Sequence, residues 1–119
     1  MEYKTYENLP VSGQYYAALG VIDAMAKKLG PKFEEPSKKV GHKYPTMQTI
    51  CPVVFLMRCE EYLWENWGEE MNTDVTDHLR RILVNLISSI PEEGIKRLDT
   101  AYITTYYRAF KEAAEEING

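Results

Sequence analysis

The sequence contains few of the residues that usually build a metal or redox centre. Of its 119 residues, two are cysteines and two are histidines. Cys51 and Cys59 would lie about 12 Å apart along one helix, which is too far for a disulfide within that helix. His42 and His78 belong to no HxxxH, CxxC or ExxH pattern. We therefore expect free thiols in a reducing compartment, no cofactor, and neither a zinc site nor a carboxylate di-iron site.

Other signatures are missing as well. The chain has no GxSxG nucleophile elbow and no GxGxxG or GxxxxGK-S/T phosphate loop. No apolar run approaches the roughly 18 residues that a membrane-spanning helix needs. The first ten residues do not place a basic segment before an apolar one, so we expect no secretory signal. These absences favour a non-catalytic cytoplasmic protein that does not contact a membrane.

The residues that are present predict an all-α fold. At 119 residues and 45% hydrophobic content, the chain can bury a core as one domain, 1–119. Apolar side chains recur with helical spacing in four segments, which predicts a compact bundle of four main helices. These helices cover roughly residues 12–30, 46–68, 74–90 and 99–117. The expected N-caps are Ser12, Thr73 or Asp74, and Asp99. We expect the first half of the second helix to be buried on every side, because it is apolar almost all round.

The remaining segments carry loop signals. Residues 1–11 are expected to form an extended N-terminal segment. Residues 30–45 contain Pro31, Pro36 and Pro45 together with Gly41, and they predict a long basic loop between the first two helices.

Charge is distributed unevenly along the chain. Residues 27–43 carry six lysines against two glutamates, whereas residues 44–79 carry one arginine against seven acids. The acidic run would create a strong local negative field, and tryptophan beside a charged rim is a common interface anchor. We therefore predict an acidic surface that docks a protein partner with a basic surface. Its residues are Glu60, Glu61, Trp64, Glu65, Glu69, Glu70, Asp74 and Asp77.

Part of this acidic run also has the spacing of a magnesium site. Glu60 and Glu61 are followed by Glu65 on one expected helix, and Asp74 and Asp77 stand on the next. The arrangement resembles the all-α nucleotide pyrophosphatases, the family that includes MazG-like proteins. Those proteins carry EExxE on one helix and ExxD on the next, and these carboxylates hold Mg²⁺ on the phosphates of a substrate.

The resemblance implies that Glu61, Glu65, Asp74 and Asp77 would be the Mg²⁺ ligands here. The sequence departs from the pattern twice, because the first spacing is one residue longer and Asp74 replaces a glutamate. In helical projection, Asp77 lies on the side opposite the apolar stripe of its helix and not toward the bundle interior. A Mg²⁺-dependent pyrophosphatase therefore stands as the alternative to an interaction protein.

The predicted basic loop offers a possible anion-binding site. Lys38, Lys39, His42 and Lys43 lie beside Tyr44, and basic residues with an interleaved aromatic ring can hold a phosphate or a single strand. A solvated loop, or a contact with the acidic run of a second copy, would use the same residues. Because the chain as a whole is acidic, nucleic acid is a weaker expectation.

The first helix carries a strip of small residues away from its apolar stripe: Gly13, Ala17, Gly20 and Ala24. Glycine inside a helix costs about 1 kcal/mol relative to alanine, so an uncovered face would rarely carry two. The strip therefore predicts close packing, either against the last helix or against a partner chain in a homo-oligomer. Together these features predict a self-associating adaptor or inhibitor subunit, of the kind that phages or mobile elements carry.

Overall fold

A computed structural model of the chain describes all 119 residues and contains helices without strands. Four helices exceed ten residues: α2 (Val11–Ala26), α5 (Pro52–Glu65), α6 (Asp74–Ser88) and α7 (Ile103–Asn118). Three are shorter: α1 (Lys4–Glu7), α3 (Pro36–Lys43) and α4 (Met47–Ile50). Single 3-10 turns occur at η1 (Lys27–Leu29), η2 (Glu69–Met71) and η3 (Thr100–Tyr102). The predicted all-α class is confirmed.

No helix of the structure combines the length and the apolar character that crossing a membrane would require.

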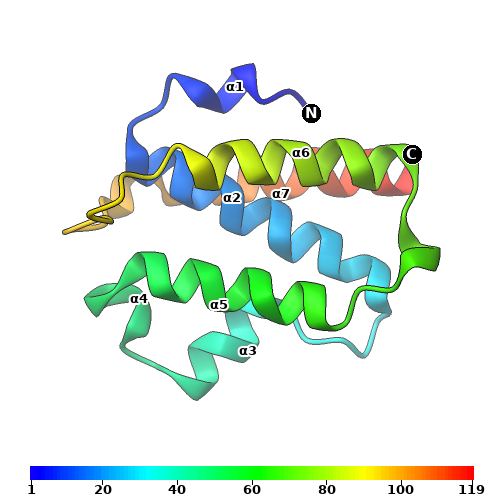
Figure 1. Cartoon of the computed structure of the whole chain (residues 1–119), viewed down its shortest axis with the longest axis horizontal. Coiled ribbons are helices and arrows are strands. Elements are labelled where there is room, and N and C mark those ends of the chain that lie inside the picture. Colours follow the sequence, from blue (N-terminus) through cyan, green and yellow to red (C-terminus); the bar gives the residue numbers. More distant parts are fainter.

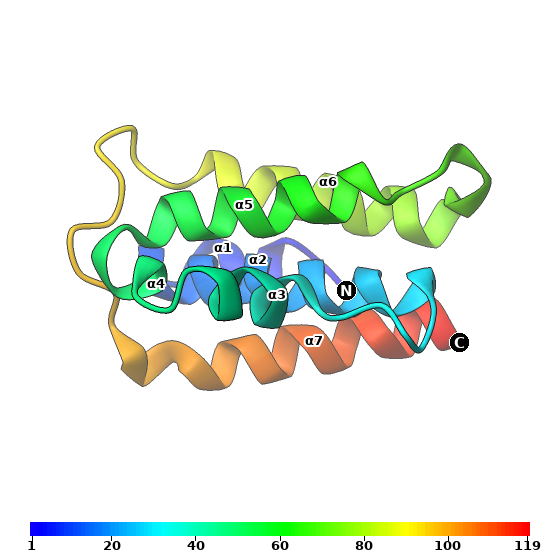
Figure 2. The same ribbon diagram turned by 90° about the horizontal axis from the view of Figure 1, so that it is seen from below.

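Helix α2 lies at the centre of the molecule (Figure 1). It packs most extensively against α7, and it also contacts α5 and α6. Figure 2 shows α5 and α6 toward one side of the molecule and α7 on the opposite side, with α2 between them. Every residue of α2 from Ser12 to Ala26 is buried. The core is therefore organised around one helix that is enclosed on all sides.

The small-residue strip of α2 is covered within the same chain. Gly13, Ala17, Gly20 and Ala24 are all buried. A Cβ at Gly20 would lie 2.5 Å from the carbonyl oxygen of Tyr106 in α7, so only glycine permits this approach of the two backbones. The assignment of these four residues to self-association is wrong, because the strip is inaccessible to a second copy. The other expectation, packing against the last helix, is confirmed.

Two segments that were expected to lack helix contain one. Residues 1–11 include α1, and residues 30–45 include α3. Pro36 is the first residue of α3, where its missing N–H leaves no helical hydrogen bond unmade. Pro36, one of the prolines that predicted a loop, is therefore the first residue of a helix.

The expected second helix is divided at Cys51. This residue has φ −140° and ψ 75°, and it separates α4 from α5. A residue before proline is sterically disfavoured in the helical region, and Pro52 follows Cys51. The first half of α5 is also not enclosed, since Val54 is 43% exposed and Met57 is 55% exposed. The fully enclosed helix is α2 instead.

The polar caps expected at Thr73 and Asp99 are present, whereas Ser12 is not a cap, because α2 begins at Val11 with Pro10 as its N-cap. The Thr73 hydroxyl accepts a hydrogen bond from the N–H of Thr76, and the Thr76 side chain accepts one from the N–H of Thr73, which makes a capping box. The Asp99 carboxylate accepts from the N–H of Ala101 at the start of η3. Such caps are each worth about 1 kcal/mol, so they fix where α6 and the α7 segment begin.

Helix α1 joins α6 to α7. The hydroxyl of Tyr6, a fully buried side chain, donates to Glu112 Oε2 of α7 at 2.7 Å. The hydroxyl of Tyr3 lies 2.8 Å from the hydroxyl of Ser89, the residue that ends α6. Residues near the start of the chain thus complete the packing of its second half.

The contact between Gly20 and α7 can be tested by substitution. We expect Gly20→Ala to lower the free energy of unfolding by about 1–3 kcal/mol, because the new methyl group would force two backbones apart. Gly41→Ala is the matched control, since the nearest atom to its Cβ lies 4.0 Å away and alanine is the better helix former. Denaturant unfolding of both variants measures the difference. Equal losses at the two positions would contradict the proposed close approach.

Candidate functional site

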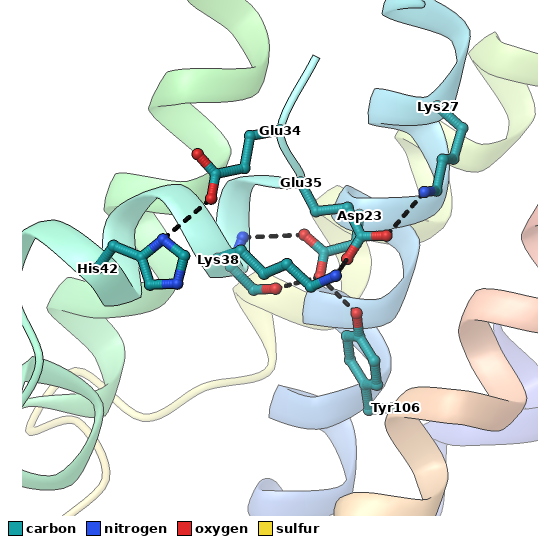
Figure 3. Close-up of polar contacts among 8 residues, drawn as sticks. Asp23, Lys27, Glu34, Glu35, Lys38, His42 and Tyr106 are labelled. Carbon is teal, nitrogen blue, oxygen red and sulfur yellow. Dashed lines mark hydrogen bonds and ion pairs between the residues drawn. The ribbon is translucent and has the colours of Figure 1, made fainter. Parts of the chain in front are cut away.

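A buried carboxylate anchors α3 to the core. Asp23 is the only charged residue between Ser12 and Ala26, and it is completely buried. Its Oδ1 accepts the backbone N–H of Ser37 at 3.0 Å. Its Oδ2 accepts the hydroxyl of Ser37 and, at 2.5 Å, the hydroxyl of Tyr106 (Figure 3). Asp23 therefore ties the first turn of α3 to α2 and α7.

This environment shifts two titrations. Burial raises the pKa of Asp23, although the hydrogen bonds from Ser37 and Tyr106 oppose that shift. Burial also raises the pKa of Tyr106, and the neighbouring Asp23 adds to the rise. Because Asp23 has no exposed surface, it can hold α3 in place but cannot touch a ligand in this conformation.

Ion pairs surround the Asp23 junction. Glu35 Oε1 lies 2.8 Å from Lys27 Nζ, and Glu35 Oε2 lies 3.7 Å from Lys38 Nζ. Glu34 Oε1 lies 3.0 Å from His42 Nδ1 (Figure 3). Two of the four residues expected to bind an anion, Lys38 and His42, are thus already beside glutamates of the same chain.

A cavity of about 280 Å³ opens next to this junction. Tyr106 and Ser37 reach both the cavity and Asp23, and the partly exposed Ile103 and Tyr107 form part of its lining. Aromatic and aliphatic side chains share the wall with Glu35, Lys38 and Gln48. The full lining is Tyr16, Leu19, Glu35, Ser37, Lys38, Gln48, Phe55, Ile103, Tyr106 and Tyr107.

The predicted acidic surface lies at one end of the bundle, on the C-terminal half of α5, on η2 and on the first turn of α6. In Figure 1 this is the end of the molecule that also carries the C-terminus. Six of its seven carboxylates are on exposed residues, and Glu60 is half-buried. None of the seven makes an ion pair. We call this set of seven carboxylates the acidic end.

The two tryptophans, Trp64 and Trp67, lie among the residues of the acidic end in the sequence. Both are half-buried and pack against the core, and their ring centroids are 5.8 Å apart. The guanidinium of Arg80 stacks over Trp64 at 4.3 Å from the ring centroid. Trp67 Nε1 donates to Asn72 Oδ1 at 2.9 Å. Trp64, the expected surface anchor, therefore shows only part of its ring.

The four carboxylates implied by the pyrophosphatase resemblance do not form a cluster. Glu61 and Glu65 line a pocket opposite α3, whereas Asp74 and Asp77 stand in the first turn of α6. No group of three or more His, Cys, Asp or Glu side chains in the structure is placed to hold a metal ion. This conformation thus lacks the arrangement that the resemblance implies.

The other two residues of the predicted anion site have a different setting from Lys38 and His42. Lys39 and Lys43 of α3 line a pocket together with Arg58 of α5. Sequence reasoning did not include Arg58, because α3 was expected to be a loop and its packing on α5 was not foreseen. Sequence reasoning also missed Asp23, although a single charge within a small, apolar helix was an available signal.

Cys59 is a poor candidate for a nucleophile. The residue is fully buried, and burial raises the pKa of its thiol far above the usual range. A protonated, inaccessible thiol is chemically inert.

Comparison of the chain with protein-family models, with curated proteins and with solved structures finds no match.

The shifted titration of Asp23 predicts a pH dependence of stability. The pKa of Asp23 in the folded state lies above the ordinary value of 3.8. The stability that Asp23 contributes is therefore fully present below pH 3.8, and it is lost as pH rises through the folded-state pKa. We expect the unfolding free energy of wild type, minus that of Asp23→Asn, to fall as pH is raised from about 4 and then to level off.

Urea unfolding across this pH range measures that difference. Asp77→Asn is the matched control, because that carboxylate is exposed and makes no ion pair. A difference for Asp23→Asn that stays constant with pH, or that rises, would contradict the assignment.

Proposed function

We propose that this protein is a non-catalytic interaction protein of the cytoplasm, an adaptor or inhibitor subunit that docks a basic protein partner through its acidic end. One observation carries the proposal: seven carboxylates share one end of the bundle and none makes an ion pair. A surface whose charges are not neutralised within the chain is free to attract a positively charged partner.

The electrostatics favour recognition of such a partner. The chain has a formal net charge of −4. The acidic end alone carries seven carboxylates, so negative charge is concentrated there. Several like charges on one surface add to a potential that steers an oppositely charged protein and raises its association rate. Over a Debye length of about 8 Å at physiological salt, neighbouring carboxylates act together. Binding at this end should therefore weaken steeply as salt is added.

The tryptophans supply the apolar part of the same surface. Trp64 and Trp67 are half-buried among the acids, and their partly packed rings would lose little freedom on contact. Interfaces commonly place an aromatic anchor inside a polar rim. The Arg80 guanidinium lies over the Trp64 ring, so a partner that contacts Trp64 would also meet this cation.

The enzymatic alternative has less support. A Mg²⁺-dependent pyrophosphatase needs several carboxylates converging on one ion, whereas Glu61 and Glu65 face α3 and Asp74 begins α6. A homo-oligomer would have to use a face other than the buried strip on α2.

Charge reversal tests the proposed docking surface. We compare Glu69→Lys/Glu70→Lys/Asp77→Lys with wild type in binding to a polyarginine peptide, followed by tryptophan fluorescence. Trp64 and Trp67 are the chain's only tryptophans, so the signal reports this end. We expect the triple variant to bind at least about tenfold more weakly at low salt, because three attractive contacts become repulsive.

The control is Glu2→Lys/Glu92→Lys/Glu93→Lys, which alters exposed acids outside the acidic end. Each substitution changes the charge by +2, so both triple variants change the net charge by +6, from −4 to +2. The control should keep most of the wild-type affinity at equal ionic strength. Equal losses in the two variants would show that net charge, and not the acidic end, determines binding, and would refute the proposal.

A further inference from the structure

A second pocket lies between α3 and α5, with a volume of about 200 Å³. Helix α3 contributes two lysines and α5 contributes an arginine, and two tyrosines, two glutamates and one valine complete the lining. The residues are Lys39, Val40, Lys43, Tyr44, Arg58, Glu61, Tyr62 and Glu65. Asp23 holds the first turn of α3, the helix that forms one wall of the pocket, against α2.

The three cations of this pocket are free of ion pairs. Lys39, Lys43 and Arg58 make none, even though Glu61 and Glu65 line the same pocket. Elsewhere on α3 the opposite holds, because Lys38 and His42 lie against glutamates. The positive charge of α3 is therefore neutralised on one side and left available on the side that faces α5.

Two of these cations are held on the same aromatic ring. Lys43 Nζ lies 5.5 Å from the ring centroid of Tyr44, and Arg58 Cζ lies 5.6 Å from it. Cation–π contacts of this kind stabilise each positive group, but two like charges near one ring also repel each other. An anion bound by both groups would offset that repulsion and accept hydrogen bonds from them.

Tyr62 also has a fixed orientation. Its ring stacks on Phe33, with centroids 5.0 Å apart. Tyr44 and Tyr62 both line the pocket, together with the three cations.

We propose that this pocket binds a phosphate monoester of a small hydroxylated molecule, such as a sugar phosphate or a nucleoside monophosphate. The guanidinium fork of Arg58 matches two phosphate oxygens, and Lys39 and Lys43 add point charges. Glu61 and Glu65 accept hydrogen bonds from hydroxyl groups on the rest of the molecule. The phosphate thus lies toward the cations and the hydroxyls toward the carboxylates.

The same features select against larger anions. Three cations and two carboxylates leave the pocket with a charge near +1, which suits one phosphate group better than a chain of them. An RNA strand passing through the pocket would bring further phosphates against Glu61 and Glu65. The volume of about 200 Å³ is also below the roughly 300–1,000 Å³ of typical drug-sized sites. The geometry therefore favours a small monoester over nucleic acid.

Calorimetric titration with ribose 5-phosphate at constant ionic strength tests this assignment, with inorganic phosphate and unphosphorylated ribose as the other two arms. We expect ribose 5-phosphate to bind with a dissociation constant of about 1 mM or below, and ribose not to bind. Inorganic phosphate should bind more weakly, since it offers nothing to Glu61 and Glu65. Equal binding of inorganic phosphate would overturn the role given to those carboxylates.

Substitutions locate the site. Arg58→Met keeps an apolar stem over Tyr44 but removes the charge, and we expect it to weaken binding about tenfold. Arg58→Lys keeps the charge and loses the fork, so it should fall between wild type and Arg58→Met. Lys111→Met is the matched control, because Lys111 is exposed on α7 and makes no ion pair. Its affinity should equal that of wild type.

No heat of binding for ribose 5-phosphate up to about 10 mM would overturn the proposal. Equal losses in Arg58→Met and Lys111→Met would overturn it as well. The triple variant of the acidic end, Glu69→Lys/Glu70→Lys/Asp77→Lys, leaves all eight pocket residues intact. It should bind ribose 5-phosphate at least as tightly as wild type, so the failure of one proposal is distinguishable from the failure of the other.

Discussion

Enclosure of α2 by α5, α6 and α7 is the constraint on which the rest of the structure depends. A helix buried on every side must carry small or apolar side chains, and each polar group on it must find a hydrogen bond. Gly20 meets the first demand, because it allows the backbone of α7 to approach. Ser12 and Gln14 meet the second: the Ser12 hydroxyl accepts the N–H of Asp99, and the Gln14 amide donates to the Glu7 carbonyl. Each polar contact of α2 therefore also fixes a neighbouring segment.

Asp23 is the one ionisable carboxyl on α2, and it also needs hydrogen-bond partners inside the core. An unpaired carboxylate in the centre of a core would be costly, and three donors from α3 and α7 reduce that cost. The same bonds place α3 against the bundle, and its basic side then faces α5. One buried acid thus determines where several surface cations lie. The pocket between α3 and α5 and the acidic end consequently meet on α5, and they share Glu61 and Glu65.

The parts of the fold that could be predicted from the sequence are those that local chemistry decides. Thr73 and Asp99 mark helix starts because a side-chain oxygen can satisfy a free N–H there, and the apolar spacing of residues 74–90 identifies α6. The segment with Pro36 and Gly41 was misread because the same residues suit a loop or a short helix, and the bond to Asp23 decides between them.

For the candidate sites, the sequence identified the acidic run, Lys39 and Lys43, but not Arg58 or Asp23. Their roles arise from contacts between α3 and its neighbours, and no local pattern encodes such contacts. The division of the lysine-rich segment into a paired and an unpaired side has the same origin, because it depends on which side of α3 meets Glu34 and Glu35. Composition alone could not separate Lys38 from Lys39.

The packing of α2 against α7 also has a consequence for synthesis. Helix α2 ends at Ala26, and the helix that covers it most extensively begins only at Ile103. At a translation rate of about 5–20 residues per second, the later helix follows by several seconds. During that interval a helix built to be buried on all sides has no complete cover. Contacts this distant along the chain also slow folding. The nascent protein therefore exposes an apolar helix that either binds general chaperones or aggregates.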